Sequence, residues 1–98
     1  MKKKQAEPTL SCKVALGMFP SERVLIIEGA DGHEIQTLAD KRDVIVEQDP
    51  TPDREVPGRV KVSIVESAGK DAVYVDLPQP GLTEGPRVKV AKASLRQT

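Results

Sequence analysis

The sequence predicts a small all-β protein, an antiparallel and partly open barrel of five to seven short strands, with room for one short helical turn. Three observations support this prediction. Val, Ile, Leu and Ala dominate the apolar residues, and the β-branched ones suit a half-buried pleated surface. Apolar and polar residues alternate over several short stretches. Segments rich in Gly and Pro separate these stretches at intervals of roughly 8–12 residues, as in small barrels and sandwiches.

The first predicted hairpin joins residues 11–16 to residues 23–27. Apolar and polar residues alternate in the first stretch, and its inward-facing side chains are Cys12, Val14 and Leu16. The second stretch is continuously apolar, which is typical of a strand buried on both faces. A five-residue connection, 17–21, links the two stretches and favours an antiparallel pair.

A second turn and two further strands are predicted before the middle of the chain. Asp31-Gly32 is a strong turn signal, and we expect a strand over 33–38 and another over 44–46. A competing interpretation makes residues 34–42 a short helix. It rests on the i, i+3, i+4 spacing of three apolar residues, Ile35, Leu38 and Ala39. The sequence leaves this alternative open.

Two segments are predicted to lie outside the strands. Residues 1–9 contain three lysines and no apolar periodicity, so we expect a disordered basic tail before one β domain over 10–96. Residues 49–58 contain three prolines and much charge. This composition excludes a central strand and predicts a loop of about ten residues, which is either mobile or functional.

The clearest pattern is a hairpin in the second half. Apolar and polar residues alternate in two stretches, 59–65 and 72–77, which a turn at 67–70 connects. The inward side chains of this hairpin are predicted to be Val60, Val62, Ile64, Val73, Val75 and Leu77. A Pro–Gly loop over 78–86 and a last strand over 87–92 follow, with Val88 and Val90 facing inward and Leu95 adding a core contact. This order of hairpin, loop, short strand and terminal apolar residue is similar to the last strands of SH3-like small barrels. The resemblance covers about a third of the chain and includes no specific motif.

Charge and cysteine content narrow the function classes. The 15 basic and 15 acidic residues cancel, although residues 22–55 contain ten acids and four bases and both ends of the chain are basic. Cys12 is the only cysteine, which excludes an intramolecular disulfide and favours a reducing compartment. The first lysines precede no apolar stretch, and no run approaches the length of a membrane helix. We therefore expect a cytoplasmic protein with no membrane partner, a monomer or weak dimer.

We expect neither catalysis nor a cofactor or metal. His33 is the only histidine and is predicted to lie exposed in a turn, while Cys12 is predicted to pack in the core as an inert thiol. Structural zinc needs about four N or S ligands, which one His and one Cys cannot supply. The acidic residues lack the spacing of a calcium loop, and the glycines lack the order of a phosphate-binding loop.

Two binding hypotheses remain. The first is a non-catalytic interaction module that binds another protein through an exposed strand edge or through Met18, Phe19 and Tyr74. The alternative is a weak, salt-sensitive nucleic-acid-binding domain, which depends on two predicted strands being neighbours. Its basic patch would consist of Arg59, Lys61, Arg87, Lys89 and Lys92, with Arg96 as an extension. The scarcity of aromatic residues for base stacking favours the first hypothesis.

Overall fold

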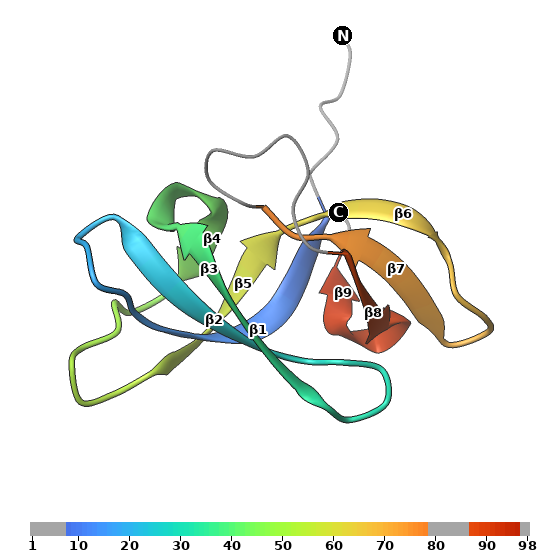
Figure 1. Cartoon of the computed structure of the whole chain (residues 1–98), viewed down its shortest axis with the longest axis horizontal. Coiled ribbons are helices and arrows are strands. Elements are labelled where there is room, and N and C mark those ends of the chain that lie inside the picture. Colours follow the sequence, from blue (N-terminus) through green and yellow to red (C-terminus); the bar gives the residue numbers. More distant parts are fainter. Residues whose placement is uncertain (1–7, 79–86, 97–98) are drawn as a thin grey trace, which may run out of the picture.

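A computed structural model describes residues 8–78 and 87–96 of the chain (Figure 1). The described residues form nine strands and two short 3-10 turns. In chain order these elements are β1 (Thr9–Leu16), β2 (Glu22–Glu28), β3 (Glu34–Asp40), η1 (Lys41–Asp43), β4 (Val44–Val46), β5 (Val56–Lys61), β6 (Ser63–Ser67), β7 (Ala72–Asp76), β8 (Arg87–Ala91), η2 (Lys92–Ser94) and β9 (Leu95–Arg96).

The strands form two antiparallel sheets. The larger has the order β3-β2-β1-β5-β4, with β9 also paired to β1, and the smaller has the order β6-β7-β8. Only Val62 separates β5 from β6, so one bent segment runs from the first sheet into the second (Figure 1). Elsewhere the backbone N–H of Ala30, in the turn after β2, donates to the carbonyl of Lys89 on β8 at 2.9 Å. These two links hold the sheets against each other.

The all-β, antiparallel prediction is confirmed, and the number of strands is higher than predicted. The predicted strand over 59–65 is divided at Val62 between the two sheets, and Leu95–Arg96 forms a ninth, two-residue strand. In addition β1 begins at Thr9, inside the predicted tail, and residues 1–7 lie outside the described residues. The predicted loop over 78–86 also lies outside them, apart from Pro78.

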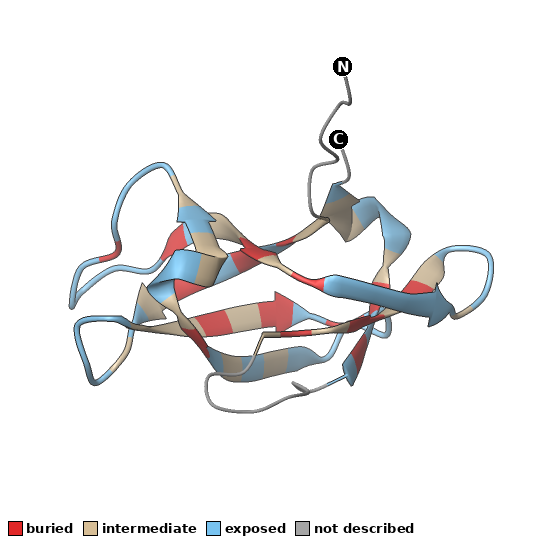
Figure 2. Cartoon of the chain, turned by 90° about the horizontal axis from the view of Figure 1, so that it is seen from above, coloured by how far each residue is buried: buried red, intermediate tan, exposed pale blue. Residues whose placement is uncertain are grey.

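The core lies between the two sheets and is almost wholly aliphatic (Figure 2). Alternate residues of most strands face it, as the period of two requires. Its buried side chains are Leu10, Cys12, Val14, Leu25, Ile27, Ala39, Val56, Val60, Val62, Val73, Val75, Leu77, Val88 and Val90. Partly buried Leu95 packs against this cluster, as predicted.

Three predictions of inward-facing side chains are wrong. Leu16, predicted to face inward with Cys12 and Val14, is 37% exposed at the end of β1. In β2 Leu25 and Ile27 are buried while Val24 and Ile26 are only half-buried. The strand is therefore fully buried on one face only, whereas its continuous apolar run predicted burial on both faces. In β6 Ile64 is 39% exposed. The register of β6 against β7 shifts between Ile64 and Glu66, and every residue of β6 is exposed. This irregularity breaks the alternation on which the prediction of Ile64 rested.

The competing interpretations of residues 34–42 are resolved in favour of a strand. β3 pairs with β2 over its whole length, from Glu28↔Glu34 to Glu22↔Asp40. A short 3-10 turn, η1, follows this strand. The carboxylate of Asp40 caps it by accepting a hydrogen bond from the N–H of Arg42 at 2.9 Å.

The predicted loop over 49–58 is shorter than expected. Pro57 and Gly58 belong to β5, where they pair with Lys13 and Cys12 of β1. Pro57 is tolerated because β4 already ends opposite Gly58, so β5 has one neighbouring strand at this position. The remaining loop contains a tight turn in which Thr51 and Arg54 exchange two backbone hydrogen bonds of 3.1 Å.

Candidate functional site

The connection between β1 and β2, residues 17–21, carries the most exposed large apolar side chains among the described residues. Met18 is 89% exposed and Phe19 is 64% exposed. Both had been nominated from the sequence as protein-binding residues. We call these five residues the β1–β2 tip.

Glu22, the first residue of β2, orders the β1–β2 tip. Its carboxylate accepts a hydrogen bond from the N–H of Met18 at 2.7 Å, and its carbonyl accepts one from the N–H of Gly17 at 3.0 Å. Its own N–H donates to the carbonyl of Phe19 at 3.0 Å, and the guanidinium of Arg23 donates to that of Pro20 at 3.0 Å. The apolar side chains are therefore displayed by a turn whose backbone is held in place. Sequence analysis missed the role of Glu22, since a charged residue at the start of a strand is unremarkable.

Tyr74, the third nominated residue, does not join this surface. It lies half-buried in β7, between Glu66 of β6 and Lys89 of β8. The β1–β2 tip and β7 lie toward opposite ends of the long axis of the molecule (Figure 1). The structure therefore brings Met18 and Phe19 together and separates both from Tyr74.

The nominated basic residues do not form one patch. Arg59 and Lys61 lie on β5 of the larger sheet, while Arg87 and Lys89 lie on β8 of the smaller sheet. The assumption that these two strands are neighbours is therefore wrong. Arg87 is also engaged by Asp76 across the β7–β8 pair, with Nε 2.9 Å from the Asp76 carboxylate. This bond holds the pKa of the Asp76 carboxyl below its usual value.

Arg59 is the best-anchored cation of the nominated set. Its Nε donates to Thr9 Oγ1 at 2.7 Å, and its Nη2 donates to the carbonyls of Thr9 and Ser94 at 2.9 and 3.1 Å. It thereby ties β5 to the start of β1 and to η2. Burial lowers the pKa of Arg59, and the nearby charge of Arg96 adds to this effect. The anchoring residues Thr9 and Ser94 were not foreseen, because the sequence does not show that they lie beside β5.

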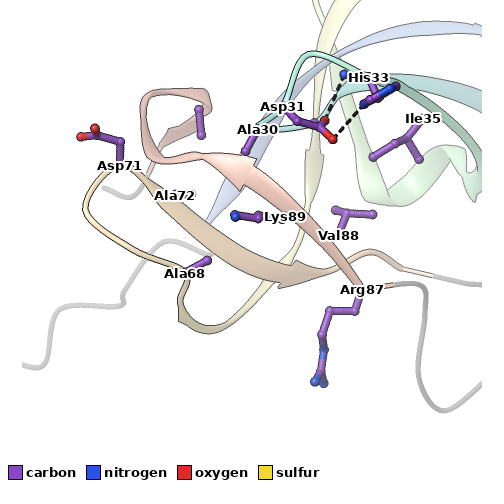
Figure 3. Close-up of a pocket in the computed structure, with 12 residues that line it drawn as sticks. Ala30, Asp31, His33, Ile35, Ala68, Asp71, Ala72, Arg87, Val88 and Lys89 are labelled. Atoms are coloured by element: carbon purple, nitrogen blue, oxygen red, sulfur yellow. Dashed lines mark hydrogen bonds and ion pairs between the residues drawn. The ribbon is translucent and has the colours of Figure 1, made fainter.

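A cleft of about 610 Å³ lies between the β2–β3 turn and β8 (Figure 3). At its rim His33 Nδ1 lies 2.8 Å from the carboxylate of Asp31, which also accepts a hydrogen bond from the N–H of His33. These bonds lower the pKa of the Asp31 carboxyl. Figure 3 shows Arg87 and Asp71 pointing away from this pair. Polar groups thus do not converge in the cleft, and His33 is exposed, as predicted.

Cys12 is buried, as predicted, on the inner face of β1. Burial raises the pKa of its thiol to about 11, against a smaller opposing effect of the Arg59 charge. A neutral thiol in this position is a weak nucleophile. Among residues 8–78 and 87–96 no three His, Cys, Asp or Glu side chains gather as a metal site. Neither helical turn in this part of the chain is long and apolar enough to span a membrane.

The buried thiol predicts a loss of stability at alkaline pH. In the unfolded chain Cys12 ionises near pH 9, but in the folded protein it stays neutral up to about pH 11. The unfolded state therefore loses its proton first, and stability falls as the pH rises between these values. We expect the free energy of unfolding to decrease by about 2 kcal/mol between pH 8 and pH 10.5 from this group alone. Urea denaturation at the two pH values measures the change.

The control for this prediction is Cys12→Ala, which removes the thiol and leaves every other side chain unchanged. The difference in stability between the two proteins should shrink as the pH rises, since only the original chain has the thiol. Parallel pH profiles would show that ionisation of Cys12 does not oppose folding.

No family model, curated protein or solved structure matches this chain. The function is therefore argued from its own geometry.

Proposed function

We propose that this chain is a non-catalytic module that binds another protein through the β1–β2 tip. The observation that carries the proposal is the exposure of Met18 and Phe19 on a hydrogen-bonded turn. Aromatic side chains and Met are enriched where proteins bind one another, and a few such anchors supply most of the binding energy. A partner with an apolar pocket fits this tip.

The order of the β1–β2 tip supports the proposal. Binding costs conformational entropy whenever a loop must be immobilised, typically 0.5–1.5 kcal/mol for each flexible side chain, with the backbone in addition. The bonds made by Glu22 and Arg23 fix the backbone before any partner arrives. The partner therefore does not need to supply hydrogen bonds to this backbone, and the tip binds it through apolar side chains alone.

The lining of the cleft beside His33 supports the non-catalytic part of the proposal. The residues that line the cleft next to His33 include no hydroxyl or thiol group in the described part of the chain. General-base catalysis through His33 would need such a group, or an ordered substrate, within hydrogen-bond reach. A cytoplasmic location, in keeping with the single reduced thiol, belongs to the same proposal.

We also propose that the two sheets form an SH3-like barrel. Three features support this interpretation: the segment that passes from β5 to β6 at Val62, the 3-10 turn η2 before the last strand, and the return of β9 to β1. The fold alone does not identify the partner, because such barrels serve many functions. Recognition of proline-rich peptides is not supported, since that groove needs a row of aromatics and the two aromatic residues of this chain, Phe19 and Tyr74, lie in the β1–β2 tip and in β7.

The test compares proteins captured from an extract of the source cells by three immobilised chains. The Met18→Gln/Phe19→Gln variant removes the apolar tip, and Ile64→Gln is the control because Ile64 is also an exposed aliphatic residue but lies on β6. Surface changes of this kind alter stability by about 0.5 kcal/mol or less. We expect a protein retained by the original chain and the control, and at least tenfold depleted by the tip variant.

Retention of the same proteins by all three chains would overturn the tip as the binding surface. Loss from both variants would instead assign binding to apolar surface in general. Capture of nothing by the original chain would contradict the proposal of a protein partner.

A further inference from the structure

A second surface, distant from the β1–β2 tip, carries two arginines on the outer face of the larger sheet. Arg59 of β5 lies opposite Ser11 of β1, and Arg96 of β9 lies opposite Thr9. Thr9 and Ser11 are two residues apart in one strand, so their side chains and those of their partners share one face. The intervening Leu10 and the following Cys12 face the core. Both guanidinium groups therefore belong to the solvent side, at the start of β1.

The charge of these arginines is not neutralised by the described residues. The three acceptors of Arg59 are a hydroxyl and two carbonyls, all uncharged. Neither Arg59 nor Arg96 forms an ion pair with any carboxylate in residues 8–78 and 87–96, although Lys13, Arg42 and Arg87 there do. Two adjacent positive charges repel each other, and an anion between them would relieve this repulsion.

Arg59 is already oriented for such an anion. Its Nε and Nη2 are used in holding Thr9 and Ser94, while its Nη1 has no hydrogen bond to the described residues. The three bonds fix the plane of the guanidinium, so little side-chain entropy remains to be lost on binding. Hydrogen bonds between guanidinium and an anion are roughly twice as strong as neutral ones.

The shape of the surroundings limits the ligand to one anionic group with an apolar neighbour. Arg59 and Arg96 line a half-open groove of about 430 Å³. The apolar part of its lining consists of Ile45, Val46, Val56 and Pro57. Glu47 also lines the groove, and Glu28 and Glu34 line the adjoining hollow that shares Ser11 and Pro57 with it. A long polyanion would meet all three acids, whereas a single anion beside an apolar side chain meets both arginines, the aliphatic wall and one acid, Glu47.

We propose that this groove binds a carboxylate of a peptide, with an apolar side chain next to the carboxylate packed against Ile45 and Pro57. The Arg59 and Arg96 guanidinium groups bind the carboxylate. The site goes beyond the proposed tip interaction, because it lies at the opposite end of β1 and contains neither Met18 nor Phe19.

The test is a titration of the full-length, ¹⁵N-labelled chain followed by amide and Arg Nε–H chemical shifts. The probe is acetyl-Leu-Glu-Leu-amide, and its counterpart with Gln in place of Glu removes only the charge. Acetyl-Leu-Leu with a free terminal carboxylate distinguishes a chain end from a side chain. We expect saturable shifts at Ile45, Gly58, Arg59 and Arg96 with a carboxylate probe, and at least tenfold weaker binding of the Gln peptide.

Arg96→Gln is the decisive variant. Arg96 is exposed and its side chain makes no hydrogen bond or ion pair to the described residues, so its replacement leaves the fold intact. The matched control is Lys92→Gln, which removes the same charge from an exposed residue outside the groove. We expect Arg96→Gln to weaken binding of the carboxylate probe at least tenfold and Lys92→Gln to change it less than twofold.

Five results would overturn the proposal. Equal binding of the Gln peptide would reduce the site to an apolar groove, and equal losses in the two variants would reduce it to bulk charge. Inorganic phosphate that binds as tightly as the peptides would show that the apolar wall adds nothing. A mixed-sequence oligonucleotide that shifts Arg87 and Lys89 together with Arg59 would favour nucleic acid instead. Absence of shifts with every probe at tens of millimolar would exclude the site.

Discussion

Replacing Leu25 with Ala is expected to lower the free energy of unfolding by about 2–5 kcal/mol. Leu25 is fully buried, and it lies in the middle of β2, opposite Val14 of β1 and Thr37 of β3. Truncation removes apolar contacts and leaves a cavity that paired strands on both sides cannot close. A domain of this size has a total stability of about 5–15 kcal/mol, so the loss is a large fraction of the whole.

Urea denaturation followed by far-ultraviolet circular dichroism measures this effect. Leu38→Ala is the matched control, because it makes the same chemical change on the neighbouring strand β3, where Leu38 is 42% exposed. We expect the control to cost about 1 kcal/mol or less. Leu25→Val, a smaller truncation, provides a measurable value if the Ala variant is largely unfolded. Equal losses at positions 25 and 38 would show that the core does not lie on this face of the larger sheet.

The contrast between these two leucines shows what the sequence predicts well. Alternation over six or seven residues identified β1, β7 and β8 and the side of each strand that faces the core, because the period of a strand is fixed by its geometry. It failed at Ile64, where the shift of register in β6 occurs. The prediction from the continuous apolar run failed in β2, where Val24 and Ile26 lie on the outer face although their neighbours are equally apolar. The local sequence pattern of a strand does not show which of its two faces the second sheet covers.

The candidate sites were less predictable than the strands. The sequence placed Met18 and Phe19 in the connection between two strands, but it favoured Phe19 as a plug of the barrel end, and Phe19 is instead exposed. The bonds from Glu22 that order the connection depend on three-dimensional geometry. Four of the five basic residues, Arg59, Lys61, Arg87 and Lys89, lie on strands as predicted, whereas Lys92 begins the 3-10 turn η2. Their separation into two sheets depends on strand order, which no local pattern encodes. The pairing of Arg59 with Thr9 joins residues fifty positions apart, and it becomes apparent only when β1 and β5 are neighbours.

Gly58 is the second position where a small change is expected to have a large effect. A Cβ atom at this residue would lie 2.7 Å from a methyl group of Val46, 2.8 Å from the carbonyl oxygen of Ile45 and 2.9 Å from a methyl group of Val14. The glycine is not among the described residues with positive φ, so the constraint is space between β1, β5 and β4 and not backbone conformation. In an unconstrained position Gly→Ala stabilises a protein by reducing the entropy of the unfolded chain. Here we expect the opposite sign, a loss of about 1–3 kcal/mol for Gly58→Ala, because a backbone oxygen cannot move aside without displacing β4.

A double-mutant cycle with Val46→Ala separates steric crowding from other causes. Val46→Ala removes the methyl group nearest to the new Cβ, so the double variant should be more stable than the sum of the two single losses predicts, by about 0.5 kcal/mol or more. Val46→Ala should relieve only part of the steric crowding, since the carbonyl of Ile45 remains in place. Additive losses, or a Gly58→Ala variant as stable as the original chain, would contradict the close approach of β4 to β5. In that case Ile45 would not be held beside Arg59, and the apolar wall of the groove would be lost with it.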